Sequence, residues 1–553
     1  MDTASRAGEL EAPSRGAVLS LSTGAGLVLS FLTLLAPFLT AEIPPLTDYP
    51  NHLARFWLLA GGAADPGLSG YYRVDWSLAS TNIGVDAAVA ALAPWVSPMV
   101  SGRLAMILAA ILPPIGLLVL SRRIFGRLTA LQVVFPIAAW STTFLMGFLN
   151  FQIGLGLALL FAAADPLARG RTRPIGALLR IPLGLILAVD HLFSLVFYAA
   201  LLAALAMGPQ AISPSDWRSM GRRAMKAALA AGWCLIPLAA MLLYAHSLPG
   251  ANVEDGRGGL RFDALPAKIA TLVSPLVTYN LGLELLLALG FAGLGVWLAF
   301  RRHLNVHWGL LLAAAAFACL SVVAPAWAAD TAWVDRRFPI MALLCLLASV
   351  QLKAAASPRL AMAVGVAALA LVAARAGWVA WNWSSAQHDL ASTRLALRGV
   401  PAGAAVLPMQ HRASFAAKWS APAGRYIWQV GDPTFRHYPA LAVPLQRAFV
   451  PTLFAVPGKQ PLQVLGSWDR FADHNGGDLA SVSALGRPRR PSDPPYLADW
   501  SKRFRYILVL NADLPDDSGS FRPPADLRLV SDQGFAQLWR VRGPPTGETR
   551  SSP

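Results

Sequence analysis

The chain has 553 residues, of which 55% are hydrophobic and 14% are charged, and its formal net charge is +16. A basic chain can bind nucleic acid, but here the arginines and lysines gather in short segments between long apolar stretches, as in the cytoplasmic loops of membrane proteins. Composition therefore argues against a nucleic-acid partner and predicts a polytopic α-helical membrane protein.

The N-terminal part of the chain predicts one span followed by a long loop. Residues 1–16 are polar and are expected to form a disordered cytoplasmic N-terminus. The apolar stretch 17–40 is longer than a signal-peptide core, so we expect an uncleaved first span. Residues 41–101 would then form the first external loop. Two aromatic patches in this loop, FWLLA (56–60) and YYRVDW (71–76), are typical of segments that lie in a membrane interface.

Ten further apolar stretches bring the expected number of spans to about eleven. They cover approximately residues 102–120, 128–145, 148–164, 175–189, 192–206, 227–244, 281–300, 308–328, 338–352 and 360–381. Basic clusters fall on every second connection, which the positive-inside rule makes cytoplasmic. Acidic residues fall on the opposite, external connections: Asp48, Asp190, Glu254, Asp255, Asp330 and Asp335.

The composition changes after residue 383, where the transmembrane domain 17–383 is expected to end. Spaced turns and short β-like runs follow, at residues 404–409, 505–511 and 535–541, with a helical run near 438–447. We expect residues 384–541 to form a soluble extracytoplasmic α/β domain of ordinary size, and residues 542–553 to be a disordered tail.

The segment PPLTDYPNHLARF (44–56) carries the clearest candidate site. If a helix begins near its aspartate, four polar side chains share one face at helical spacings: Asp48, Asn51, His52 and Arg55. An acid, an imidazole and a guanidinium are costly beside lipid, so this face is expected to border a cavity or water. The alternative is that Asp48 caps the helix. His52 would orient the acid, bind phosphate or hold a metal, or else be an ordinary interfacial side chain.

Two other external connections contain candidate site residues. In VDRRFP (334–339), Arg336 and Arg337 suit a lipid phosphate, because guanidinium groups bind phosphate oxygens in a planar fork. The alternative is a membrane-border anchor paired with Asp335 or Asp330. Asp190 and His191 would bind an acceptor or a metal, or simply supply the polar residues of a tight turn.

The acidic segment WDRFADHNGGD (468–478) lies in the expected C-terminal domain. A solvated turn is the favoured interpretation, because Asp, Asn and Gly dominate such turns. Contact with an acceptor glycan is the alternative.

An acidic first external loop, many spans and an extracytoplasmic C-terminal α/β domain together resemble the GT-C superfamily of membrane glycosyltransferases. At residue level the resemblance depends on TDYPNHLAR (47–55). Asp48 matches the essential acid of the family, and His52 matches a histidine found a turn later in many bacterial members. The adjacent second acid of several branches is absent, and so is the WWDYG-type signature of oligosaccharyltransferases.

The resemblance implies a bacterial inner-membrane enzyme, similar to the arabinosyl-, mannosyl- and galacturonosyl-transferase types. It would move a hexose or pentose, with inversion, from a polyprenyl-phosphate donor at the membrane lipid to an envelope glycan, lipid or protein. Asp48 would be the catalytic base. Arg336, Arg337 and Arg55 would bind the donor phosphate, and His52, Asn51, Asp190, His191 and Asp335 would be candidates for contact with substrate or metal.

The sequence leaves the cofactor undefined, with a divalent cation as one option. Two other functions remain open. A transporter or lipid-glycan flippase would need ionisable residues near the middle of its spans. A non-catalytic membrane protein would use its C-terminal domain for binding or assembly.

Overall fold

The computed structural model describes residues 21–165, 173–211, 217–248, 259–328, 331–427, 431–457, 459–519, 523–524 and 526–542. Several expectations concern residues outside these ranges: the N-terminal segment 1–16, Glu254, Asp255, Asp330, and all of 542–553 except its first residue.

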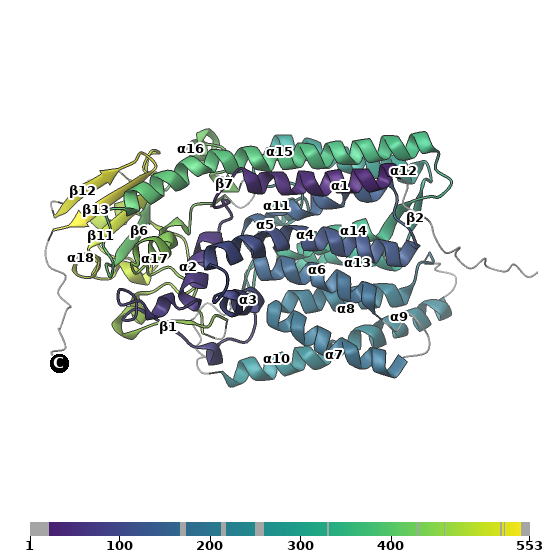
Figure 1. Ribbon diagram of the computed structural model, residues 1–553, viewed down its shortest axis with the longest axis horizontal. Coiled ribbons are helices and arrows are strands. Elements are labelled where there is room, and N and C mark those ends of the chain that lie inside the picture. Colours follow the sequence, from purple (N-terminus) through teal and green to yellow (C-terminus); the bar gives the residue numbers. More distant parts are fainter. Residues whose placement is uncertain are drawn as a thin grey trace, which may run out of the picture.

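Most of the chain forms a bundle of helices, many of which run along the long axis of the molecule (Figure 1). Its helices are α1 (Leu21–Leu35), η1 (Ala36–Leu39), α4 (Pro98–Phe125), η4 (Ala130–Trp140), α5 (Thr142–Leu145), α6 (Leu149–Ala164), α7 (Arg173–Asp190), α8 (Leu192–Met207), α9 (Trp217–Gly232), α10 (Leu235–Ser247), α11 (Leu265–Thr271), α12 (Leu281–Phe300), α13 (Trp308–Val323), η6 (Asp335–Arg337), α14 (Phe338–Ser349) and α15 (Pro358–Leu397). Two short antiparallel pairs also belong to it: β2 (Leu304–Val306) with β5 (Val350–Leu352), and β3 (Trp327–Ala328) with β4 (Thr331–Ala332).

Within the described residues, five helices are long and apolar enough to cross a membrane: Ser22–Leu39, Pro98–Phe125, Arg218–Ser247, Leu281–Phe300 and Pro358–Leu397. The outer face of α12 is apolar, with Phe300 87% exposed and Leu286 67% exposed. Such a surface is unfavourable in water and is stable against lipid. The chain is therefore a helical membrane protein, and the number of about eleven spans stays a prediction.

The stretch 128–145 differs from the simple span that its hydrophobicity predicts. It forms η4, an eleven-residue 3₁₀ helix in which every residue is buried, followed by the short α5. At about 2 Å per residue η4 covers about 22 Å, and at about 1.5 Å per residue α5 adds about 6 Å, so the two together are close to the thickness of a bilayer core. Pro136 lies within it, and proline lacks the backbone N–H that an α-helix needs. Hydrophobicity here reflects burial inside the bundle.

The C-terminal part of the chain forms a five-stranded mixed sheet at one end of the bundle (Figure 1). β6 (Val406–Gln410) is parallel to β10 (Ala480–Ser481) and β11 (Tyr506–Leu510), and β13 (Ala536–Val541) is antiparallel to β11 and β12 (Leu527–Asp532). The three β-like runs of the sequence coincide with β6, β11 and β13. Every residue of β6 and β11 is buried, as continuous apolar runs in parallel strands predict.

Short elements connect these strands. They are α16 (Phe415–Ser420), β7 (Tyr426–Ile427), β8 (Asp432–Pro433), η7 (Tyr438–Leu441), α17 (Ala442–Gln446), β9 (Leu462–Val464), η8 (Gly466–Phe471), η9 (Val482–Gly486), η10 (Pro495–Leu497) and α18 (Trp500–Arg503). The helical run expected near 438–447 corresponds to η7 and α17.

The first loop packs against the C-terminal domain. It contains α2 (Tyr49–Leu59), η2 (Gly62–Ala64), β1 (Tyr72–Val74), η3 (Trp76–Leu78) and α3 (Gly84–Leu92). β1 pairs with β9, and the hydroxyl of Tyr72 donates to the carbonyl oxygen of Val450 at 2.8 Å. Phe56, Leu58 and Tyr72 are buried in protein, so these side chains of the two aromatic patches do not face a membrane interface, whereas Trp76 is 38% exposed.

Helix α15 joins the bundle to the sheet without a break. Its 40 residues extend about 60 Å, twice the thickness of a bilayer core. The expected domain boundary at residues 383/384 therefore falls inside this helix. The composition changes there because the surroundings of the helix change from bundle to C-terminal domain.

Candidate functional site

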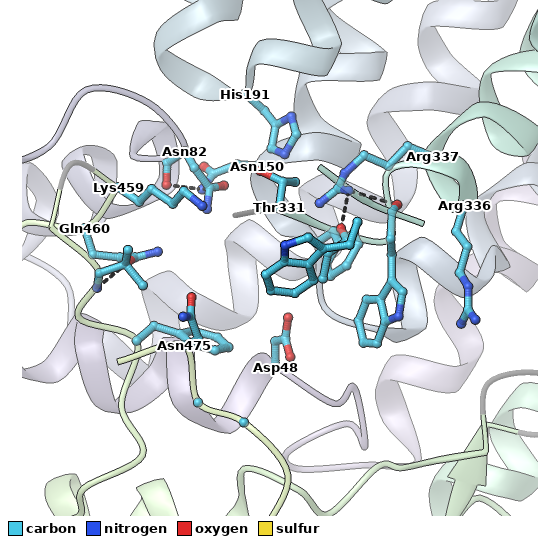
Figure 2. Close-up of a pocket in the computed structure, with 18 of the residues that line it drawn as sticks. Asp48, Asn82, Asn150, His191, Thr331, Arg336, Arg337, Lys459, Gln460 and Asn475 are labelled. Atoms are coloured by element: carbon cyan, nitrogen blue, oxygen red, sulfur yellow. Dashed lines mark hydrogen bonds between the residues drawn. The ribbon is translucent and has the colours of Figure 1, made fainter. Parts of the chain in front are cut away.

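A cavity of about 700 Å³ lies between the bundle and the C-terminal domain (Figure 2). Its charged and imidazole side chains are Asp48, His52, His191, Arg261, Asp263, Arg336, Arg337, Asp432, Arg436, His437, Lys459, Asp473 and Asp478. Nine residues were predicted as site residues, and the cavity brings together Asp48, His52, His191, Arg336 and Arg337. The other four do not line it: Asn51, Arg55, Asp190 and Asp335.

Asp48 stands at the position before α2, yet its side chain does not cap that helix. Backbone contacts hold it instead: the amide nitrogen of Asp48 donates to the carbonyl oxygen of Met146 at 3.0 Å. Gly147, which follows Met146, has a φ of +91°. A Cβ on Gly147 would lie 3.0 Å from the Cβ of Asp48. The backbone therefore positions Asp48, and its carboxylate lines the cavity (Figure 2).

His52 belongs to a buried chain of polar contacts beneath Asp48. Its Nδ1 lies 3.0 Å from a guanidinium nitrogen of Arg55, and its Nε2 lies 3.1 Å from the carbonyl oxygen of Gly147. A guanidinium only donates, so Nδ1 accepts and Nε2 carries the proton that it donates to Gly147. Burial, together with the charge of Arg55, lowers the pKa of His52 well below its ordinary value. His52 is therefore neutral and both its ring nitrogens are occupied, so the predicted metal or phosphate contact is wrong.

Arg55 has a structural role, and the prediction that it binds the donor phosphate is wrong. Its Nε and one terminal nitrogen donate to the two carboxylate oxygens of Asp86 on α3, at 2.7 and 3.0 Å. Both side chains are at most 1% exposed. The ion pair joins α2 to α3 and leaves Arg55 outside the cavity wall.

Arg337 forms part of the cavity wall at the start of α14. One of its terminal nitrogens donates to the carbonyl oxygens of Ala332 and Trp333, at 2.6 and 2.9 Å. Its guanidinium lies 4.9 Å from the ring centre of Phe148 and 5.0 Å from that of Phe193. Burial lowers the pKa of Arg337 to about 10, so the side chain remains a cation at neutral pH.

Arg336 is the less occupied of the two arginines. Its Nε and one terminal nitrogen are buried and have no hydrogen-bond partner among the described residues. The other terminal nitrogen lies 3.6 Å from Asp263, and the guanidinium lies 5.7 Å from the ring centre of Trp333. Buried donors without acceptors cost free energy, so this wall of the cavity suits an anionic ligand.

Two more of the predicted residues, Asp335 and Asp190, are buried away from the cavity. Asp335 is fully buried and pairs with Lys268 of α11, so it does not serve Arg336 or Arg337 as a direct partner. Asp190 is 5% exposed and packs against Gly154 of α6, away from the cavity. Its neighbour His191 lines the cavity, while its Nδ1 accepts the backbone N–H of Phe193 and caps α8. The predicted Asp190–His191 pair is therefore split.

The C-terminal domain contributes cavity residues that the sequence analysis missed. His437 is 2% exposed, and its Nε2 lies 3.4 Å from Oδ1 of Asp48. Arg436 pairs with Asp432 and with Asp478. No local pattern links these residues to Asp48, because the two regions are far apart in the sequence. The acidic segment 468–478 was the one available signal, since Asp473 and Asp478 line the cavity.

A metal centre is not evident in the described part of the chain. No group of three or more His, Cys, Asp or Glu side chains is arranged there to hold a metal ion.

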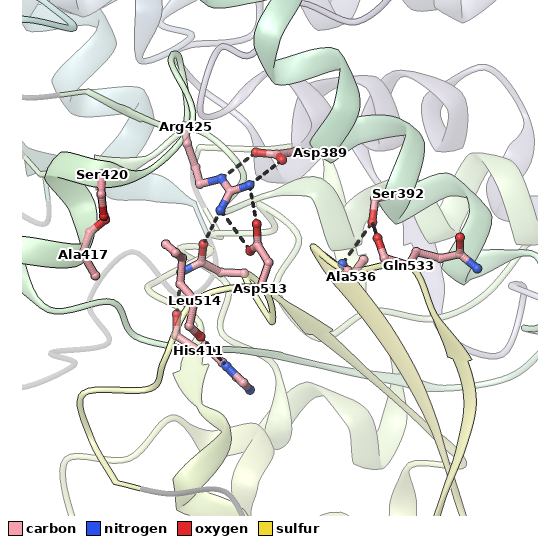
Figure 3. A network of polar contacts seen from close by, with 12 residues as sticks. Asp389, Ser392, His411, Ala417, Ser420, Arg425, Asp513, Leu514, Gln533 and Ala536 are labelled. Carbon is pink, nitrogen blue, oxygen red and sulfur yellow. Dashed lines mark hydrogen bonds and ion pairs between the residues drawn. The ribbon is translucent and has the colours of Figure 1, made fainter.

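A second cluster of charges, around Arg425, lies outside the cavity (Figure 3). Its Nε and one terminal nitrogen donate to the two oxygens of Asp389 on α15, at 2.8 and 2.7 Å. Asp513 and Asn511, which follow β11, bind the other terminal nitrogen at 3.0 and 3.2 Å. The guanidinium is 2% exposed and joins α15 to the C-terminal domain, which is a structural role.

We expect Arg425→Met to destabilise the protein by about 3–5 kcal/mol, because it leaves the buried carboxylate of Asp389 without its cation. Thermal unfolding in detergent measures the effect. The matched control is Arg394→Met on α15, the helix that contains Asp389. The partner of Arg394, Glu42, is 64% exposed, so loss of this pair should cost under about 1 kcal/mol. Equal shifts for the two variants would contradict the structural role of Arg425.

Comparisons with family models, curated proteins and solved structures found no match to this chain. The function is therefore inferred from the chemistry of the cavity itself. Among the charged side chains that line it, the cavity combines a carboxylate positioned by the backbone, Asp48, with two arginines that contact aromatic rings, Arg336 and Arg337.

Proposed function

We propose that the protein is a membrane glycosyltransferase of the GT-C type. It transfers a sugar, with inversion, from a polyprenyl-phosphate donor to an envelope glycan, lipid or protein. Asp48 is the base, and Arg336 and Arg337 bind the donor phosphate. The observation that carries the proposal is that one cavity contains a carboxylate not used for capping and, across from it, buried guanidinium donors that have no acceptor in the part of the chain that the structure describes (Figure 2).

The reaction needs two groups that the cavity contains. A base removes the proton from the acceptor hydroxyl, whose oxygen then forms a bond to the anomeric carbon. The bond between that carbon and the phosphate oxygen breaks, and the phosphate leaves with the electron pair. Because the departing phosphate is a stable anion, it needs cationic hydrogen-bond donors and no strong acid. A lone Asp48 and two arginines are sufficient for these steps.

The wall around the arginines also suits a lipid-linked donor. Three aromatic rings contact the two guanidinium groups, namely Phe148, Phe193 and Trp333. Leu192 and Trp327 also line the cavity. A phosphate on an isoprenoid chain presents an anion next to an apolar tail, and this wall offers cations next to apolar side chains. The opposite wall, from the C-terminal domain, is polar and carries Asp473, Asn475 and Gln460, which suits sugar hydroxyls.

The proposal includes the topology that the charge distribution predicts. About eleven spans would cross a bacterial inner membrane, with the N-terminus in the cytoplasm and the C-terminal domain in the periplasm. The basic segments 121–127, 168–173 and 301–303 support this orientation, since each lies between apolar stretches on the same predicted side.

We expect Asp48→Asn to lower the rate of sugar transfer by about 100-fold or more, because the amide cannot accept the proton of the acceptor. The measurement uses membrane vesicles that contain the native acceptor, supplied with synthetic polyprenyl-phosphate pentoses, hexoses and uronic acids. Asp75→Asn, in the same loop and outside the cavity, is the control. Normal transfer by Asp48→Asn would show that Asp48 is not the base, whereas no transfer by the wild-type protein from any of these donors would refute the proposed function and favour a binding or assembly role.

We expect Arg336→Gln to lower kcat/KM for the donor by about 10- to 100-fold, since hydrogen bonds to a charged group contribute about 1.5–3 kcal/mol. Unfolding temperature should change little, because the closest carboxylate to Arg336 is 3.6 Å away. Arg73→Gln is the control, since its guanidinium binds Gln463 away from the cavity. An unchanged kcat/KM for Arg336→Gln would remove this residue from the phosphate site.

We expect Gly147→Ala to reduce transfer strongly, because the new Cβ would press on Asp48 at 3.0 Å and displace its carboxylate. The left-handed backbone also destabilises the variant, by about 1–2 kcal/mol. Gly126→Ala separates the two effects: its φ is +76° and nothing lies within 4 Å of its Cβ. It should show similar destabilisation with full transfer. Equal activities of the two variants would show that the contact with Asp48 is unimportant.

A further inference from the structure

The C-terminal domain places an imidazole against the proposed base. Nε2 of His437 lies 3.4 Å from Oδ1 of Asp48, although the two residues come from opposite ends of the chain. His437 precedes η7, is 2% exposed and lines the same cavity as Asp48. Nε2 can donate to Asp48 only if it is the ring nitrogen of His437 that carries the proton.

Asn51 determines that tautomer through its own backbone contacts. Its Oδ1 accepts the amide N–H of Phe454 at 3.0 Å, and its Nδ2 donates to the carbonyl oxygen of Thr452 at 2.9 Å. An amide N–H cannot accept and a carbonyl oxygen cannot donate, so the side-chain amide of Asn51 has one orientation. Its Nδ2 therefore faces Nδ1 of His437, at 3.2 Å.

The Nδ2 group of Asn51 only donates, so Nδ1 of His437 accepts. The proton of the neutral ring is then on Nε2, the nitrogen that faces Asp48. A hydrogen on Nδ1 would face the N–H of Asn51 and could not accept from it, so the contact with Asn51 requires Nδ1 to be without a proton. A neutral donor orients a carboxylate while weakening it as a base less than a cation does.

We propose that His437 is a positioning residue for Asp48, and that Asn51 holds His437 in the Nε2–H tautomer required for this task. The inference deepens the proposed function and rests on it. It assigns a role to the buried Asn51, which does not touch the cavity, and it makes the C-terminal domain part of the reacting site. Asp48 takes the proton of the acceptor, and His437 keeps the carboxylate aimed at that hydroxyl without gaining or losing a proton.

Two substitutions of His437 test the orientation of Asp48 by kinetics. His437→Leu removes the donor and should lower kcat by about 10- to 100-fold while KM for the donor stays close to the wild-type value, because binding depends on the arginine wall. His437→Gln can place an amide N–H near the position of Nε2 and should restore most of the lost kcat. His474→Gln is the control, since His474 pairs with Asp469 outside the cavity.

A spectroscopic measurement reads the tautomer without using activity. Nitrogen-15 NMR of the full-length protein labelled at histidine, assigned by comparison with His437→Gln, should show Nε2 protonated and Nδ1 unprotonated at neutral pH. An Nδ1–H tautomer or an imidazolium would overturn the assignment.

The kinetic outcomes separate this inference from the proposed function. If Asp48→Asn abolishes transfer and His437→Leu retains the wild-type kcat, the positioning role alone is refuted. If His437→Leu raises KM for the donor and leaves kcat unchanged, the positioning role is refuted as well, since that pattern indicates a contact with the donor. If Asp48→Asn transfers normally, Asp48 is not the base and the positioning role fails with it; if the wild-type protein transfers no sugar from any of the donors, the proposed function itself fails.

Discussion

The arrangement of the cavity depends on a short backbone contact between the first loop and the bundle. The amide nitrogens of Thr47 and Asp48 donate to the carbonyl oxygens of Leu145 and Met146, each at 3.0 Å. Gly147 continues this contact, because it has no Cβ and its carbonyl oxygen binds the ring of His52. Asp48 is thus positioned by hydrogen bonds of the main chain, and its carboxylate is left to face the cavity and His437.

Charges around this contact fall into two groups, and desolvation explains the difference. Arg55 with Asp86 and Lys268 with Asp335 are buried ion pairs that neutralise each other and hold helices together, although one terminal nitrogen of Arg55 and one oxygen of Asp335 lack a hydrogen-bond partner among the described residues. A buried charge without such a partner is unstable, particularly in a protein surrounded by lipid. Arg336 retains buried donors without acceptors in the described structure, and it lies where the cavity offers room for an anion.

The C-terminal domain is part of the site and does not merely extend from the membrane. It supplies His437, Lys459 and the segment that contains Asp473, and it is joined to the bundle by α15. The buried contact of Asp389 with Arg425 and the pairing of β1 with β9 secure the same interface. The cavity therefore has one wall from the bundle and one wall from the C-terminal domain.

The sequence by itself determined the membrane class, three of the five strands of the sheet and the start of a helix at Asp48, because hydrophobicity and local spacing report on local structure. It also predicted that Asp48, His191 and the arginine pair would share one side of the protein, and all of them line one cavity. Only the tertiary structure decided which polar side chains are buried in ion pairs, as those of Arg55 and Asp335 are, and which line the cavity. It also brought His437 to Asp48. Contacts between distant parts of a chain follow from how helices pack, and no local pattern of residues encodes them.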